Sequence, residues 1–466
     1  MRSCVINCMQ RLSSATPIRL LHEWMPWGVA LYVALWPFPS LANAVLCLCG
    51  GLFVIQLLLT RSDGAWMLLD KPAWALSAVL FLGYWLPEVL SIQPPHALQI
   101  ARKALFDLRY LPFMWVAAIA VNRSDQRQTT LTLVGVIVAI WTVDGLLQWQ
   151  APMSPLFSIL NRAMQSVSGQ WLCAPDRVAS ADRLSGLWGP CHLKFGLVLV
   201  SVSPFLIVLA ANYRRWLGIV AALAVLVVLL LAGSRASWLS YGLILISFVW
   251  RRIRLSQLIT SVCVVGGLAA IVFLTSWYAR ERIARTALFM GGDTVHYDQA
   301  LSGRLRIWKV ATCVIETHPL RGGGVRQFRH LYAQCDAASD RPVWGEGAAF
   351  HPHQLLLEIL TETGLVGFLC WLLAIAMAWQ AWRSASHSAR HLARPALIAL
   401  GAILFPINSH LAVYSSFWGG VTVFLAGLYV GMLFQRPTLC GGDLDLDQTS
   451  HTHNRAGGGY APLVTG

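Results

Sequence analysis

Charged side chains are scarce in this sequence. They make up 12% of its 466 residues, whereas hydrophobic residues make up 56% and the mean hydropathy is +0.59. This composition excludes an ordinary water-soluble domain and indicates a chain that crosses a membrane many times. Acidic residues are the scarcer sign, with 21 Asp and Glu against 35 Lys and Arg and a formal net charge of +14. In so apolar a chain that excess predicts contact with anionic lipids, not nucleic acid.

Metal ligands at binding spacings are absent as well. The eleven cysteines follow no metal-ligand pattern, and the acidic residues of the long polar segments are scattered, so we expect no metal site. Transporters typically carry charged residues near the middle of the membrane and are often built from inverted repeats. In this sequence charges near the middle of an apolar run are almost absent, and no inverted half-repeat is visible, so the sequence disfavours a transporter.

Long apolar runs make up most of what is present. A helix needs roughly 20 residues to cross about 30 Å of hydrocarbon. Runs of that length begin near Trp24, Ala42, Ala73, Leu105, Thr129, Pro190, Trp216, Ala236, Ser256, His353, Pro395 and Phe417. The sequence therefore predicts an all-α polytopic membrane protein with about twelve transmembrane helices.

The charges beside the helix ends predict the orientation and the domains. Short loops on one face carry clustered basic residues such as Arg214 and Arg215, which places that face and both termini in the cytoplasm. The predicted parts are a cytoplasmic segment 1–22, helices one to nine over 23–276 with an outer loop near 150–189, a large, mostly helical outer domain 277–352 between helices nine and ten, helices ten to twelve over 353–435, and a disordered cytoplasmic tail 436–466.

The outer face carries more positive charge than its topology requires. This excess predicts an anionic ligand held on that face, and contact with acidic lipid headgroups is the alternative. Charge placement makes four arginines candidates for binding the anion: Arg183, Arg306, Arg321 and Arg326. Four cysteines lie in or beside the outer loops, and either pairing within each loop or free thiols is open for them: Cys173, Cys191, Cys313 and Cys335.

A glycine turn in the outer domain suggests how an anion could be held. A helix is predicted from Ser302 to Thr317, and Gly322-Gly323-Gly324 then opens a second helix. The start of a helix offers free amides and a positive dipole end to a phosphate, and Arg321 and Arg326 flank this turn. The turn is either a phosphate cradle or only a connector between helices.

Two histidines around a proline bring titratable rings to the outer membrane border. Pro352 suits the first turn of a helix, so His353 is expected just inside the helix of the tenth run. Counting 100° per residue places Gly364 and Gly367 on the face of His353, where another helix or a lipid tail could approach. Cationic neighbours would lower the pKa of His353 and keep the ring neutral, as a base requires. His353 could instead be a helix-border residue bonded to a backbone carbonyl, and His351 is the second candidate base.

These residues resemble the bacterial O-antigen ligases, within the O-antigen ligase and polymerase family of integral-membrane glycosyltransferases. The ligase pattern is His, then Asn, Ser or Gln, nine residues, Gly, two residues, and a small residue or Tyr. It is met here by His353-Gln354, Gly364 and Gly367. Further similarity over roughly the second half of the chain lies at Ser234-Arg235-Ala236, Gly303-Arg304-Leu305 and His318-Pro319-Leu320.

The resemblance implies a GT-C-like fold and a reaction in lipopolysaccharide synthesis. O-antigen polysaccharide would pass from undecaprenyl diphosphate to a sugar hydroxyl of lipid A-core, at the periplasmic face of the bacterial inner membrane. The reaction would invert the anomeric carbon without a metal or other cofactor. His353 would be the base on the acceptor hydroxyl, and Arg235 and Arg304 would hold the diphosphate. The partners are then the lipid-linked donor, the lipid A-core acceptor and membrane lipids, with no nucleic acid.

Two rival functions stay open at this point. An O-antigen polymerase or a protein O-oligosaccharyltransferase would share the fold and the donor and would differ in the acceptor. A membrane transporter belongs to another class and is disfavoured by the missing midplane charges.

Overall fold

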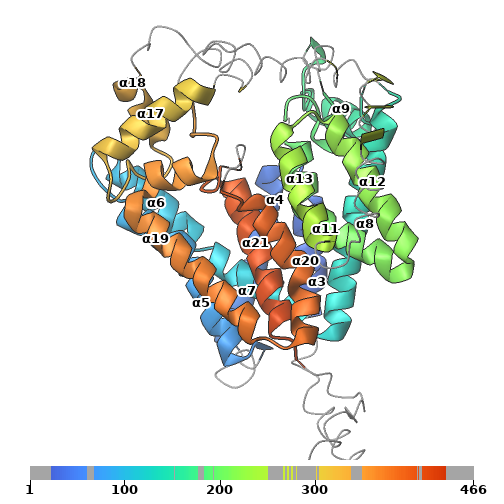
Figure 1. The fold of residues 1–466 in the computed structure, drawn as a ribbon, viewed down its shortest axis with the longest axis horizontal. Coiled ribbons are helices and arrows are strands. Elements are labelled where there is room, and N and C mark those ends of the chain that lie inside the picture. The colour runs from blue at the N-terminus through green and yellow to red at the C-terminus, as the bar shows by residue number, and fades with distance from the viewer. Residues whose placement is uncertain are drawn as a thin grey trace, which may run out of the picture.

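The computed structural model describes residues 23–59, 68–151, 153–176, 183–192, 194–249, 304–336, 349–406 and 412–436, with a few single residues and pairs between them. Every regular element in these ranges is helical (Figure 1). The first half contains α3 (Met25–Ala34), α4 (Pro39–Leu59), α5 (Lys71–Leu90), α6 (Ala97–Asp107), α7 (Tyr110–Asn122), α8 (Ser124–Gln148), α9 (Pro155–Ser168) and the 3₁₀ turn η2 (Gly186–Trp188). The second half contains α11 (Phe195–Tyr213), α12 (Arg215–Leu231), α13 (Arg235–Val249), α17 (Arg304–Thr317), α18 (Phe328–Cys335), α19 (Leu355–Ser384), α20 (His387–Ile403) and α21 (Ser416–Leu433).

The predicted multi-pass helical architecture is confirmed. Within the described ranges, seven helical segments are long and apolar enough to cross a membrane, and α3 and α12 are shorter apolar helices. The predicted total of twelve stays a prediction, because the run from Ser256 lies largely outside the described residues. The predicted segment 1–22 and almost all of the tail 436–466 also lie outside them.

One predicted span begins earlier than expected and is divided. The run assigned to start near Leu105 is preceded by α6, and the chain bends between Asp107 and Tyr110 before α7 continues. Apolar residues on α6 gather on one side and charged residues on another, which is the pattern of a helix at a surface and not of a membrane-crossing one. The predicted start of this span therefore followed the hydropathy of α7 and did not include the amphipathic α6.

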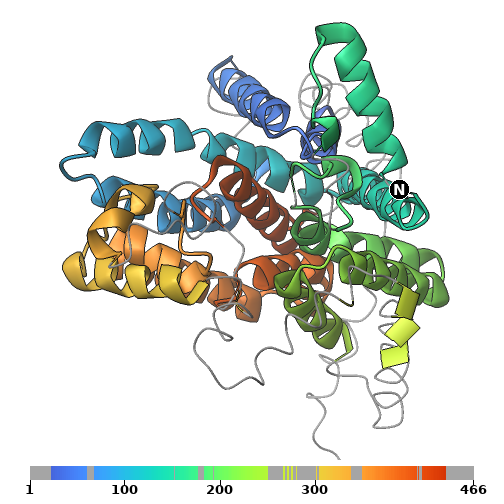
Figure 2. The same cartoon turned by 90° about the horizontal axis from the view of Figure 1, so that it is seen from above.

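Helix α21 is the centre of the bundle, and Figure 2 shows it surrounded by other helices. Nearly all of its residues are buried. Gly427 and Gly431 face α7, where an added Cβ would lie 2.5 Å from the Met114 carbonyl oxygen and 2.0 Å from that of Ala118. Small residues one turn apart allow two membrane helices to approach this closely. A helix from the first half of the chain and one from its last part are thereby joined in one core.

The described part of the predicted outer domain has a small core of its own. Helices α17 and α18 enclose Ile307, Val310, Val314 and Phe328, separately from the large membrane core. A disulfide between Cys313 and Cys335 joins these two helices, and a second disulfide joins Cys173 to Cys191. Pairing within each outer loop, one of the two alternatives, is thus what the structure shows.

Helix α9 was not expected from the sequence. Ser154 caps its start by accepting a hydrogen bond from the Phe157 amide, and Ser154 in turn donates to Asp144 of α8. In Figure 1 α9 lies at the same end of the molecule as α17 and α18. The two long loops therefore share one face, and its assignment to the periplasm stays a prediction.

Candidate functional site

His353 lies outside helix α19, contrary to the prediction. The helix begins at Leu355, and the side chain of Gln354 caps it by accepting from the Leu357 amide while donating to the Pro406 carbonyl at 2.9 Å. His353 has a positive φ of 55°, a left-handed conformation that ends any helical continuity. Pro352 therefore belongs to a turn and not to a helix start. The face calculated from His353 for Gly364 and Gly367 is wrong for the same reason.

The two histidines form a pair. Their ring centroids are 4.0 Å apart, and the backbone amide of His353 donates to Nδ1 of His351 at 3.3 Å. Because Nδ1 of His351 accepts this bond, the neutral ring of His351 carries its proton on Nε2. His351 thus stabilises the turn that contains His353, and the two candidate bases lie side by side.

Two arginines from distant segments are linked electrostatically to His353, Arg304 directly and Arg235 through Arg304. Arg235 is the first residue of α13 and Arg304 is the first residue of α17. Burial, and after it the charge of Arg235, lowers the pKa of Arg304 to about 10. Burial, and after it the charge of Arg304, lowers the pKa of His353 to about 4. The ring is therefore neutral at pH 7, next to a region of positive potential that favours an anion.

This electrostatic coupling predicts a change in the pH profile of the Arg304→Gln variant. A base must be unprotonated, so transfer should be lost only as the pH falls toward about 4 in the wild-type chain. Removing the neighbouring charge raises the pKa of His353, so the acid limb of kcat/KM for the acceptor should move to higher pH. Lys309→Gln, on an exposed position of the same helix, is the matched control and should leave the limb in place. Equal limbs in all three proteins would contradict the coupling.

The glycine turn is locked into a break in α19. Gly364 has φ 64° and ψ −163°, which interrupts the helix and frees backbone groups on both sides. The amides of Gly323 and Gly324 donate to the carbonyls of Thr361 at 2.7 Å and Glu362 at 3.0 Å. In return, the amides just after Gly364 donate to the carbonyls of residues 319 and 320. Each segment thus satisfies the polar groups that the other exposes.

The prediction of an open phosphate cradle at this turn is therefore wrong. The amide of Gly322 donates to the His318 carbonyl, and the next two glycine amides are used by α19, so none of the three points at a ligand. The turn needs these glycines for close approach: a Cβ on Gly322 would lie 2.5 Å from the Glu362 carbonyl carbon. The glycine turn is therefore a connector between helices, the second of the two alternatives, and it makes long-range contacts with α19. Gly367 lies further along α19, where an added Cβ would be 3.2 Å from Pro87 of α5, so a helix and not a lipid tail approaches it.

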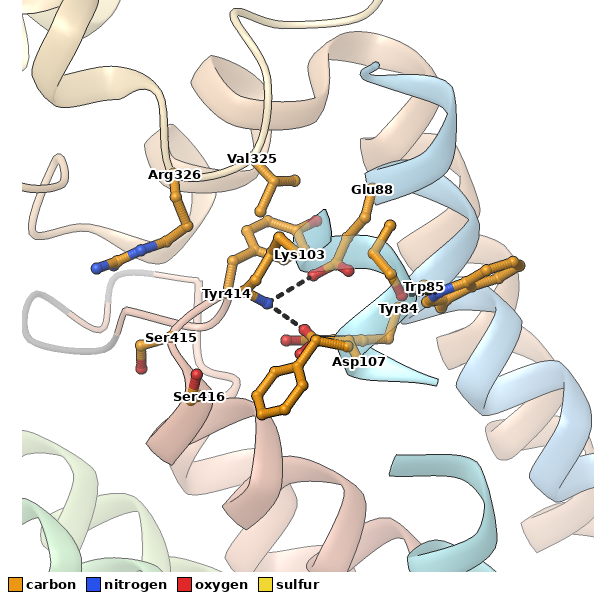
Figure 3. A network of polar contacts seen from close by, with 12 residues as sticks. Tyr84, Trp85, Glu88, Lys103, Asp107, Val325, Arg326, Tyr414, Ser415 and Ser416 are labelled. Carbon is orange, nitrogen blue, oxygen red and sulfur yellow. Dashed lines mark hydrogen bonds and ion pairs between the residues drawn. The ribbon is translucent and has the colours of Figure 1, made fainter. Parts of the chain in front are cut away.

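Arg326 is held in place by the same interlock. It has a positive φ of 65°, and its amide donates to Oε2 of the buried Glu362 at 3.0 Å. Figure 3 shows its side chain extended away from Lys103. Burial, and after it the charge of Arg326, lowers the pKa of Lys194, whose ammonium lies 5.7 Å from the ring centroid of Phe417. Lys194 was not among the candidates and joins the outer basic groups here.

The remaining candidate arginines are placed differently. Arg306 forms a two-point ion pair with Asp336, at 2.9 Å and 2.6 Å, so its charge is already matched within the outer domain. Arg321 is exposed on the glycine turn. Arg183 is half-buried, and the amide of the next residue donates to the Leu231 carbonyl, which places Arg183 near the segment that leads into Arg235. Of the six, Arg304 is the one whose charge acts on His353, and Arg235 is the one whose charge acts on Arg304.

A buried charge network was not predicted from the sequence. Lys103 bonds both Glu88, at 3.3 Å, and Asp107 (Figure 3). Arg109 bonds the same Asp107 at 3.0 Å. The hydroxyl of Tyr110 donates to the carbonyl of Ser416, where α21 begins. The Lys103–Asp107 spacing of four on α6 is the local signal that could have revealed it. The network fixes α5 and α6 against the outer end of α21.

The part of the chain that the structure describes contains no set of side chains that could bind a metal ion. No three side chains of His, Cys, Asp or Glu converge there. Metal independence stays a prediction, because long stretches of the outer domain lie outside those ranges.

The fold is that of a multi-pass helical membrane protein, and its candidate site combines a histidine with basic side chains. A family model described as O-antigen ligase matches residues 219–372, a region that includes Arg235, Arg304 and His353. Over this region the chain is similar to the O-antigen ligase family, which confirms the resemblance seen in the sequence. A comparison with curated proteins finds no match. The family is one of glycosyltransferase-like membrane enzymes that act on lipid-linked polysaccharide and lipopolysaccharide-related substrates.

Proposed function

We propose that this protein is an O-antigen ligase that transfers O-antigen polysaccharide from undecaprenyl diphosphate to a sugar hydroxyl of lipid A-core. The observation that carries the proposal is that Arg304 acts electrostatically on His353 and is itself acted on by Arg235, all within the region that the O-antigen ligase family model matches. A neutral imidazole beside two guanidinium groups matches a reaction that consumes a hydroxyl proton and releases a diphosphate.

The reaction is assigned to these residues in one displacement step. His353 takes the proton of the acceptor hydroxyl, and the oxygen attacks the anomeric carbon of the donor sugar opposite its bond to the diphosphate. The new glycosidic bond forms as the carbon–oxygen bond to the diphosphate breaks, so the configuration inverts. Arg235 and Arg304 balance the negative charge that grows on the leaving diphosphate. No step requires a metal or a cofactor.

The site is assigned to the periplasmic face of the inner membrane. Two disulfides, Cys173–Cys191 and Cys313–Cys335, lie in the long loops at the end of the molecule that carries the site. Disulfides form in the bacterial periplasm and are rare in the cytosol. The basic short loops at the opposite end favour the cytoplasm for that face.

The acceptor separates the ligase from its rivals. Purified chain, lipid-linked O-antigen and EDTA would be combined with lipid A-core, with an acceptor peptide, or with a second portion of lipid-linked O-antigen. We expect the polysaccharide on lipid A-core alone, measured by the shift of the product on a gel. Elongation of the lipid-linked chain would instead identify a polymerase, a glycosylated peptide would identify a protein O-oligosaccharyltransferase, and loss of transfer in EDTA would contradict the metal-free step.

A further inference from the structure

A second basic region lies at the other end of the bundle, away from His353. A cleft of about 600 Å³ opens between α13, α19 and α20, near the junction where α19 ends and α20 begins. In Figure 1 this junction is at the bottom, opposite α17 and α18. The proposed transfer reaction makes no use of it.

One face of α20 lines this cleft and changes character along its length. His387, Arg390, His391 and Arg394 follow at spacings of three, one and three, so they share one side of the helix. The same side continues with Leu397 and Ile398 and ends in small residues. The face is thus basic over its first two turns and apolar over the next two, as a single amphiphilic ligand requires.

The other walls of the cleft extend the same pattern. Trp379 and Trp382 of α19 line it, and indole rings favour the border between lipid tails and headgroups. The guanidinium of Arg394 donates to the carbonyls of Ser247 and Phe248 near the end of α13 and so joins α13 to α20. None of the described lining residues is acidic. The positive charge of the cleft is therefore not balanced by its own walls.

We infer that this cleft binds an anionic phospholipid, with the headgroup phosphate among His387, Arg390 and His391 and an acyl chain along Leu397 and Ile398. The combination of a basic mouth with an apolar continuation on the same helix face selects a lipid over a free phosphate, which would use only the mouth. The bound lipid braces α13 and α20 together. This inference depends only on the cleft and is independent of the proposed ligase function.

The test measures lipid binding by the full-length chain in detergent. Phosphatidylglycerol, phosphatidylcholine and inorganic phosphate are added separately, and the melting temperature and the lipids retained in native mass spectrometry are recorded. We expect phosphatidylglycerol to be retained and to raise the melting temperature, whereas phosphatidylcholine and phosphate do neither. In Arg390→Ala/His391→Ala the apparent affinity should fall about fivefold or more, as expected for loss of a basic contact to an anionic lipid. Arg394 is left unchanged because it joins α13 to α20.

Two further variants keep the outcome decisive. Arg383→Ala removes an exposed charge at the same end, outside the cleft lining, and should bind like the wild type. Gly401→Leu fills the apolar end, where an added Cβ meets open space, and should weaken lipid binding without any change of charge. Equal binding by the double variant and Arg383→Ala would overturn the proposal. An equal response to inorganic phosphate or to phosphatidylcholine would overturn it as well.

Discussion

His353→Asn should reduce transfer to lipid A-core by about 100-fold to 10,000-fold, the range for loss of a general base. Asparagine is the informative replacement because it adopts left-handed backbone conformations more readily than most residues, and φ at this position is 55°. The turn should therefore persist while the base is lost. The rate of transfer at saturating donor is the measurement, and the melting temperature in detergent should stay near that of the wild type.

His351→Asn is the control for this prediction. His351 contacts His353 through its ring and through Nδ1, so its loss should loosen the turn and lower transfer far less than loss of His353 does. If His351→Asn removed activity and His353→Asn kept it, the second candidate would be the base.

Gly364→Ala should destabilise the protein by about 3 kcal/mol or more. Its φ of 64° and ψ of −163° lie in a region that is essentially restricted to glycine, and occupying it costs about 1–3 kcal/mol. An added Cβ would also lie 2.4 Å from the Leu320 carbonyl oxygen and 2.5 Å from the Gly322 amide nitrogen. Overpacking of this kind costs typically about 1–3 kcal/mol more. The free energy of unfolding in detergent is the measurement, and it should fall together with transfer activity.

Gly51→Ala supplies the matched comparison for this substitution. Gly51 lies within the regular helix α4, and an added Cβ there meets nothing within 4 Å. Alanine is the better helix former, so this variant should be as stable as the wild type or slightly more so. A Gly364→Ala variant as stable as Gly51→Ala would show that the break in α19 and its interlock with the glycine turn do not form.

Helix positions were largely predictable because they depend on local composition. The apolar runs near Ala73 and Phe417 begin within two residues of α5 and α21, since length and hydropathy decide where a chain enters a membrane. The amphipathic helix α9 escaped prediction because it has 14 residues, fewer than the roughly 20 by which the membrane-crossing runs were recognised. The bend after Asp107 escaped it because a window average joins α6 to α7.

The site was predictable in its members and not in its geometry. The spacing from His353 to Gly364 and Gly367 identified three residues with particular positions in the structure. The prediction nevertheless assumed one regular helix from His353 onward, whereas Gln354 caps the start of α19 and Gly364 interrupts it. Contacts such as that between the Arg326 amide and Glu362, 36 residues later, depend on this break and have no local signal. The pairing of Arg306 with Asp336 likewise depends on how α17 meets the end of α18, so charge counting placed Arg306 among the ligand candidates.

The most direct measurement is a density map of the full-length chain with an undecaprenyl diphosphate sugar whose transfer is blocked. The diphosphate oxygens should lie about 3 Å from the guanidinium groups of Arg235 and Arg304, with the anomeric carbon facing the ring of His353. A diphosphate bound elsewhere, with His353 packed against protein and remote from the sugar, would contradict the proposed site.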